Sequence, residues 1–133
     1  MATVIQFRLS PRSGVSPYLQ LVQQVRQALR LGMLLPGDQL PTVKTVAGTL
    51  TINPNTVLKA YRELEHEGLV AGRPGQGTFV VKSLAGPPPG TQVELQRSLQ
   101  RWLRSAVDAG LDVDSIVALF ETSLRAARQE EIA

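Results

Sequence analysis

Two segments of the sequence, residues 44–62 and 73–77, carry polar side chains of the kinds that recognise a polyanion. Lysine can neutralise a phosphate or donate to guanine, asparagine can pair with adenine in bidentate fashion, and threonine or leucine can touch a thymine methyl group. Glycines in a turn allow a close approach to another backbone. The candidate residues are Lys44, Asn55, Thr56, Leu58, Lys59, Arg62, Arg73, Gly75, Gln76 and Gly77. For each polar residue, the alternative is an ordinary solvated surface group.

The distribution of charge along the chain supports a polyanionic partner for the first part only. Residues 1–82 contain nine Lys or Arg and four Asp or Glu, a net charge of +5. The remaining residues contain five Arg and seven acids, a net charge of −2. The overall charge of +3 therefore combines two segments of opposite character.

The composition argues against an enzyme and against a metal protein. The chain has no Cys and a single His, which excludes thiolate metal sites, Cys nucleophiles and a histidine metal cluster. No nucleophile-base pair stands out, and we expect no cofactor. The chain also lacks an export signal and a run of about 18 apolar residues, so we expect a cytoplasmic protein.

Three helices are predicted in the first part of the chain. Pro17 begins the first, which has an apolar stripe up to about Arg30. Thr42 can cap a short second helix. Asn53 has the short acceptor side chain of an N-cap, and Pro54 suits the first helical position because it has no N–H to leave unsatisfied. The tripeptide Asn-Pro-Asn is therefore interpreted as the start of a third helix, which ends at Gly68.

Short strands are predicted on both sides of these helices. Alternating apolar residues in IQFRL, residues 5–9, predict a half-buried strand. The stretch LVAGRPGQGTFVV predicts two strands, at about 69–73 and 77–82, around a glycine-rich tip. Three helices followed by a β-hairpin is the order of a winged helix-turn-helix domain, in which the third helix enters the major groove and the hairpin flanks it. The alternative for the hairpin is a simple tight turn.

A Pro/Gly linker at 83–91 separates this domain, residues 1–82, from a tail at 92–133 that contains two amphipathic helical patterns. Asp112 is the expected cap of the second helix. Two helices are too few for a core of their own, so their stripes need a partner: a second copy of the chain or, alternatively, the first domain. The stripe residues expected at a dimer interface are Leu95, Leu99, Trp102, Leu103, Ala106, Ile116, Val117, Phe120 and Leu124. The predicted fold class is mainly α with a small β-hairpin: a winged helix-turn-helix domain followed by a two-helix C-terminal dimerisation tail.

About residues 15–81 resemble the bacterial GntR family of transcription regulators. The residues that carry the resemblance are PYLQLVQQVRQAL, GMLLPGDQLPTVKTVAGTLTINPNTVLKAYRELEHEGLV and GRPGQGTFV, in family order and spacing. The opening FRLSPRSGVSPY, the Asn-Pro-Asn tripeptide and the short helical tail are similar to the YtrA-type subfamily, which dimerises through such a tail.

The resemblance implies a sequence-specific regulator that binds double-stranded DNA, acts as a repressor and forms a homodimer on an inverted-repeat operator. The alternative is a winged-helix protein-interaction module without specific DNA binding, which would show no salt-dependent affinity for DNA. Two helices cannot readily enclose a metabolite pocket. A cavity at the dimer interface stays open as a site for a small-molecule effector of unknown identity.

Overall fold

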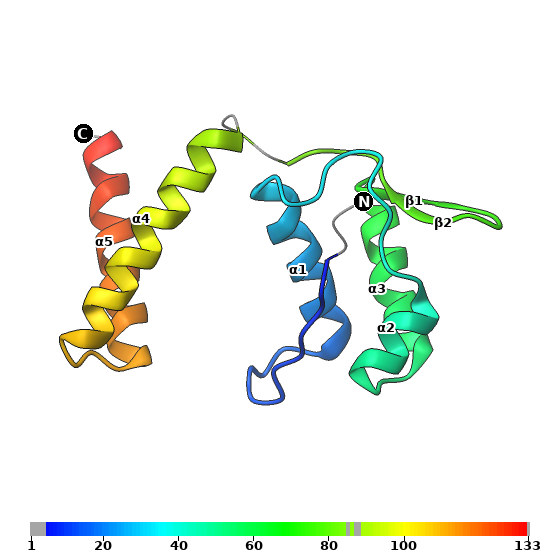
Figure 1. Cartoon of the computed structure of the whole chain (residues 1–133), viewed down its shortest axis with the longest axis horizontal. Coiled ribbons are helices and arrows are strands. Elements are labelled where there is room, and N and C mark those ends of the chain that lie inside the picture. The colour runs from blue at the N-terminus through cyan, green and yellow to red at the C-terminus, as the bar shows by residue number, and fades with distance from the viewer. Residues whose placement is uncertain (1–4, 85, 87–88, 133) are drawn as a thin grey trace. The chain divides into compact units, whose positions relative to one another are not determined.

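The structure, a computed structural model, describes residues 5–84, 86 and 89–132, and the chain divides into two compact units, Met1–Pro89 and Gly90–Ala133. Unit 1 contains three helices and a β-hairpin, and unit 2 contains two helices (Figure 1). Helices dominate both units. This agrees with the predicted class, mainly α with a small hairpin.

Unit 1 is built around the third helix. Helix α1 spans Pro17–Arg30, α2 spans Val43–Leu50 and α3 spans Pro54–His66, and both α1 and α2 pack against α3. The apolar stripe of each helix faces this shared core, as the 3.6-residue period requires. Its largest fully buried side chains are Leu21, Leu29, Leu34, Leu64, Val22, Val25, Val57, Val70 and Val80.

The hairpin that follows α3 consists of β1, Val70–Arg73, and β2, Gly77–Val80, paired antiparallel with Val70 opposite Val80 and Arg73 opposite Gly77. The connection between α1 and α2 adds hydrogen bonds along β2. Gly37 N donates to Val80 O at 2.8 Å, and Leu40 N donates to Thr78 O at 2.9 Å. The sequence did not reveal this extra pairing, which covers the edge of the hairpin. Three helices and the hairpin together form the expected winged helix-turn-helix.

The strand predicted at residues 5–9 was wrong, although its burial pattern was right. Phe7 is buried and Arg8 is exposed, but the backbone forms no ladder with another strand. Two glutamine side chains of α1 satisfy that backbone instead. Gln24 accepts from Arg8 N at 2.8 Å and donates to Arg8 O at 2.6 Å, while Gln20 accepts from Ser10 N at 2.7 Å. Each primary amide offers both a donor and an acceptor, as a neighbouring strand would.

Unit 2 consists of α4, Pro89–Asp108, and α5, Val113–Ile132, which run in opposite directions (Figure 1). Gly110 has a φ of +95° in the connecting turn, and Leu111 N donates to Ala106 O at 3.0 Å. Asp112 caps α5, because its Oδ1 accepts from Ser115 N at 2.8 Å. Hydrogen bonds from the Ser115 side chain and then from its backbone lower the pKa of Asp112.

The beginning of α4 differs from the expected start of the tail at residue 92. The helix begins three residues earlier, at Pro89, inside the expected linker 83–91. Proline is compatible with the first turn, where its missing N–H would have no helical partner. Residues 85, 87 and 88 of that linker lie outside the described residues.

Candidate nucleic-acid interface

Side-chain caps determine where the two helices of the helix-turn-helix begin. Thr42 Oγ1 accepts from Thr45 N at 3.1 Å at the start of α2, and Asn53 Oδ1 accepts from Asn55 N at 2.8 Å at the start of α3. Between the helices, Thr51 adopts a left-handed conformation with φ of +55°. Both predicted caps are confirmed, and Pro54 is the first residue of α3 as expected.

Tyr61 connects α3 to the segment that leads into α2. Its hydroxyl donates to Pro41 O, and its ring is buried in the core. Burial also raises the pKa of Tyr61, since the charged phenolate would lose its hydration. The hydroxyl therefore stays protonated and links α3 to the segment just before α2.

The outward face of α3 presents most of the predicted contact residues of this helix. Asn55, Lys59 and Arg62 are exposed, whereas Thr56 and Leu58 are half-buried. The opposite face is anchored in the core by Val57, Ala60, Tyr61 and Leu64. Lys44 is exposed in the first turn of α2. Helix α3 can thus present amide, ammonium, guanidinium and methyl groups to a groove without disturbing the core.

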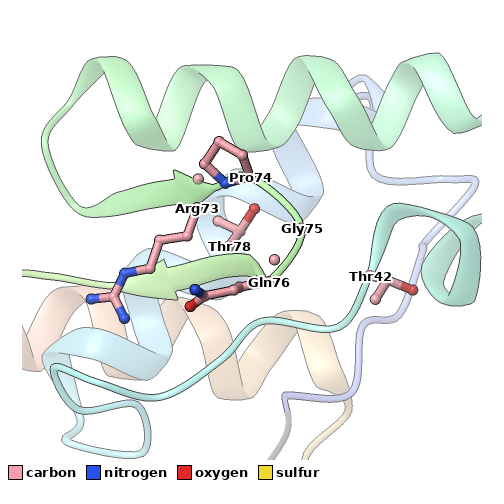
Figure 2. Close-up of a pocket in the computed structure, with 8 residues that line it drawn as sticks. Thr42, Arg73, Pro74, Gly75, Gln76 and Thr78 are labelled. Atoms are coloured by element: carbon pink, nitrogen blue, oxygen red, sulfur yellow. The ribbon is translucent and has the colours of Figure 1, made fainter.

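The remaining predicted contact residues lie in the hairpin. Arg73, Gly75 and Gln76 are exposed and Gly77 is half-buried. The tip and Thr42 line one open hollow of about 630 Å³, and Figure 2 shows Thr42, at the start of α2, on the other side of it from the tip. The start of α2 and the tip of the hairpin therefore border the same surface.

Two polar side chains outside the hairpin hold it in place. Gln39 Nε2 donates to Gln76 O at 2.9 Å at the tip. Glu65 Oε2, from α3, accepts from Gly72 N at 2.7 Å. Neither contact is predictable from the sequence, because nothing in the spacing of a lone Gln or of a Glu on a helix indicates which backbone group it will bind.

Two aromatic rings that the sequence analysis did not select contact predicted DNA-binding cations. Lys59 Nζ lies 3.9 Å from the centroid of the Tyr18 ring, and Arg73 Cζ lies 4.5 Å from that of Phe79. In Figure 2 the guanidinium of Arg73 lies over β2, on the side away from the hairpin tip. Both distances are within the range of a cation–π interaction.

Arg26 behaves differently from these cations. Its guanidinium donates to both carboxylate oxygens of Glu67, at 2.9 and 2.7 Å. The hydrogen bond that Arg26 donates to Glu67 is the main reason that the pKa of Arg26 is raised. This bidentate pair connects α1 to the end of α3 and leaves little net charge at that position.

The predicted dimer residues form apolar stripes that remain largely in water. Leu95, Leu99 and Trp102 on α4 and Val117, Phe120 and Leu124 on α5 are all exposed. Leu103 and Ile116 are half-buried, and only Ala106 of the expected stripe is buried. Packing within unit 2 therefore leaves most of both stripes uncovered.

Other kinds of site find little support in the described ranges. No three His, Cys, Asp or Glu side chains there lie close enough together to hold a metal ion. None of the helices in the same ranges has the length and apolar character needed to cross a membrane.

Known proteins place the chain in a family. Residues 17–80 match the profile of bacterial regulatory proteins of the gntR family. The chain is 33% identical over 110 residues to the HTH-type transcriptional repressor YtrA of Bacillus subtilis (strain 168), covering 82% of this chain and 85% of the relative. The chain belongs to the GntR family.

Solved structures of the same fold agree with this assignment. YtrA from Sulfolobus acidocaldarius, a GntR-family transcription factor, is similar with a TM-score of 0.51 and 29% identity, covering 71% of this chain and 97% of the other. A structure described as a transcriptional antiterminator from Listeria monocytogenes EGD-e has a TM-score of 0.56 and 27% identity, covering 90% of each chain. The resemblance to the GntR family and to YtrA is thus confirmed, and the chain is a winged helix-turn-helix transcription regulator with a DNA-binding domain.

Proposed function

We propose that this GntR-family regulator is a homodimeric repressor that binds an inverted-repeat operator in the bacterial cytoplasm. Residues 1–82 bind the DNA and residues 92–133 form the dimer. The observation that carries the proposal is the exposed polar face of α3, on a helix whose start is held by the Asn53 cap. A capped, core-anchored helix can present Asn55 and Lys59 to base edges or phosphates with little loss of conformational freedom.

Each part of the interface has a distinct role in this proposal. Helix α3 enters the major groove, where Asn55 addresses adenine and Thr56 or Leu58 contacts a thymine methyl group. Lys44 and Arg62 bind phosphates on either side. The hairpin flanks the groove, where Arg73 and Gln76 contact phosphate or the minor groove and Gly75 and Gly77 allow the backbone to approach.

Dimerisation through the tail is supported by the exposure of its apolar stripes. Leu95 is 63% exposed and Phe120 is 49% exposed, which is unusual for large apolar side chains that recur on one face of a helix. A second copy of the chain has an identical stripe, so a two-fold arrangement would cover both at once. The two identical DNA-binding domains of such a dimer then require two matching half-sites in the DNA.

Selection of bound fragments from a random duplex library tests the proposal. We expect a recurring inverted repeat, with an affinity that falls steeply as salt rises because phosphate contacts release counterions. Arg62→Ala should weaken binding, whereas Arg101→Ala, a matched loss of charge on α4, should have little effect. Recovery of no preferred sequence, together with weak and salt-independent binding, would instead favour a protein-interaction module.

A further inference from the structure

Two cations of the proposed DNA interface contact aromatic rings in place of carboxylates. Lys59 Nζ lies over Tyr18, and the Arg73 guanidinium lies over Phe79. Within the described part of the chain, neither cation has a carboxylate within ion-pair distance, whereas Arg26 is paired with Glu67. The two cations come from different elements, α3 and β1, so the same arrangement occurs twice independently.

A ring and a carboxylate have opposite consequences for a cation that must bind phosphate. A carboxylate neutralises the cation and has to be displaced or compensated when phosphate arrives. The quadrupole of a ring attracts the cation but leaves its full charge available to a second partner. Long Lys and Arg side chains lose rotamer entropy when they bind, so prior placement reduces that loss.

Both rings are themselves held by the fold. Tyr18 lies in the first turn of α1, is half-buried and packs against the core of unit 1. Phe79 is half-buried in β2, where its backbone pairs with Ala71 on one side and with Gln39 on the other. The position of each cation is therefore coupled to a rigid element.

We propose that Tyr18 and Phe79 are positioning residues that hold Lys59 and Arg73 ready for DNA phosphates, one on the recognition helix and one on the wing. This inference rests on the proposed DNA-binding function. The inference assigns Lys59 to phosphate contact. The Lys59 ammonium lies over the Tyr18 ring of α1, and from that position we expect it to bind a phosphate and not a base edge. Tyr18 and Phe79 act through the two cations and contribute no sequence preference of their own.

Ring-removing and ring-keeping variants of the full chain test this inference against a duplex of random sequence. Tyr18→Leu and Phe79→Leu should each lower affinity about two- to fivefold, the effect of an exposed cation–π contact. Tyr18→Phe and Phe79→Tyr keep a ring and should retain the wild-type affinity. The ring-removing variants should leave the salt slope unchanged because the cation remains, whereas Lys59→Ala should reduce it by about one unit for each DNA-binding domain that contacts the duplex.

A double-mutant cycle separates positioning from a general effect on the fold. If Tyr18 acts through Lys59, adding Tyr18→Leu to Lys59→Ala should cause no further loss of affinity. In the free wild-type protein, the ring current of Tyr18 should also shift the Lys59 ε-methylene protons upfield, and Tyr18→Phe should preserve that shift. This second measurement does not depend on the folding of Tyr18→Leu.

Two results would overturn the inference while leaving the proposed function intact: additive losses in the cycle, or a Lys59→Ala variant that binds every duplex as the wild type does. An absence of salt-dependent duplex binding by the wild type would contradict the proposed function itself. The two failures are therefore distinguishable.

Discussion

At the scale of single residues, the start of α3 depends on one side chain. Asn53 Oδ1 accepts from Asn55 N and so satisfies a backbone donor that the helix cannot. The neighbouring residue, Pro54, needs no such acceptor. The cap therefore contributes to stability, whereas the polar residues that follow it on the outward face are free to serve recognition.

Replacing the Asn53 cap should lower the stability of the fold. Asn53→Ala should lower the free energy of unfolding by about 1 kcal/mol, because Ala offers no acceptor to the first turn. Asn53→Asp, which keeps the acceptor, is the control and should retain most of the stability. Chemical denaturation measures both. Equal stability of the Ala variant and the wild type would show that the first turn of α3 does not need this bond.

Lys59 should show the opposite behaviour to Asn53. The side chain is exposed on α3, and its contact is with the ring of Tyr18. Lys59→Ala should leave the free energy of unfolding within about 0.5 kcal/mol of the wild type, since surface substitutions usually change it little. The same variant should bind all duplexes more weakly. A large loss of stability with unchanged DNA affinity would assign Lys59 to the fold.

At the scale of elements, the hairpin is positioned by groups that lie outside it. The Gln39 side chain donates a hydrogen bond to the carbonyl of Gln76, and the Glu65 carboxylate accepts one from the amide of Gly72. Gly77 makes this arrangement possible: its φ is +126°, and a Cβ there would lie 2.5 Å from Gln39 Nε2. A side chain at this position would push the Gln39 amide away from the tip.

Gly77→Ala should therefore disturb the wing in two ways. It strains the backbone, at a cost of about 1–3 kcal/mol, and it breaks the bond from Gln39 to Gln76. Gly48→Ala is the matched control, because nothing lies within 4 Å of that position and Ala suits the helix interior. We expect lower stability and weaker DNA binding for the first variant, and about 0.5–1 kcal/mol of added stability for the second. Comparable stabilities would contradict this role for Gly77.

The elements differ in how far the sequence predicts them. Caps and terminators are local, so Thr42, Asn53 and Gly68 correctly indicated where helices begin or end. The strand predicted at 5–9 failed because its partner is a pair of glutamine side chains, which a burial pattern cannot distinguish from a neighbouring strand. Gln39 and Tyr18 contact residues far away in the sequence, Gln76 and Lys59, whereas Glu65 and Phe79 contact Gly72 and Arg73 across a turn. Their contacts depend on the packing of α1, α3 and the hairpin, which no local pattern specifies.

At the scale of the whole molecule, charge and apolar surface are divided between the two units. The basic excess lies in residues 1–82, and the exposed apolar stripes lie on α4 and α5. A single DNA-binding domain binds its half-site with the affinity of one set of contacts. In a dimer, once one domain is bound, the second is held near the other half-site at a high effective concentration. Dimerisation should therefore control operator affinity.

A charge in the stripe should separate the dimer. Phe120→Glu places a carboxylate where the second copy would cover the side chain, and an unpaired charge in such an interface is unfavourable. Thr122→Glu adds the same charge on the exposed side of α5 away from the stripe and is the control. Sedimentation should show monomers for the first variant and dimers for the second. A stable dimer of Phe120→Glu would place the interface elsewhere.

The central claim is that two α3 helices bind one operator with two-fold symmetry, and footprinting of the full chain on a selected duplex tests it most directly. We expect two protected half-sites related by an inverted repeat, with centres about one helical turn, roughly 34 Å, apart on the same side of the DNA. Phe120→Glu should lose this paired protection at concentrations where Thr122→Glu retains it. Protection of single, unpaired half-sites by the wild-type chain would contradict the account.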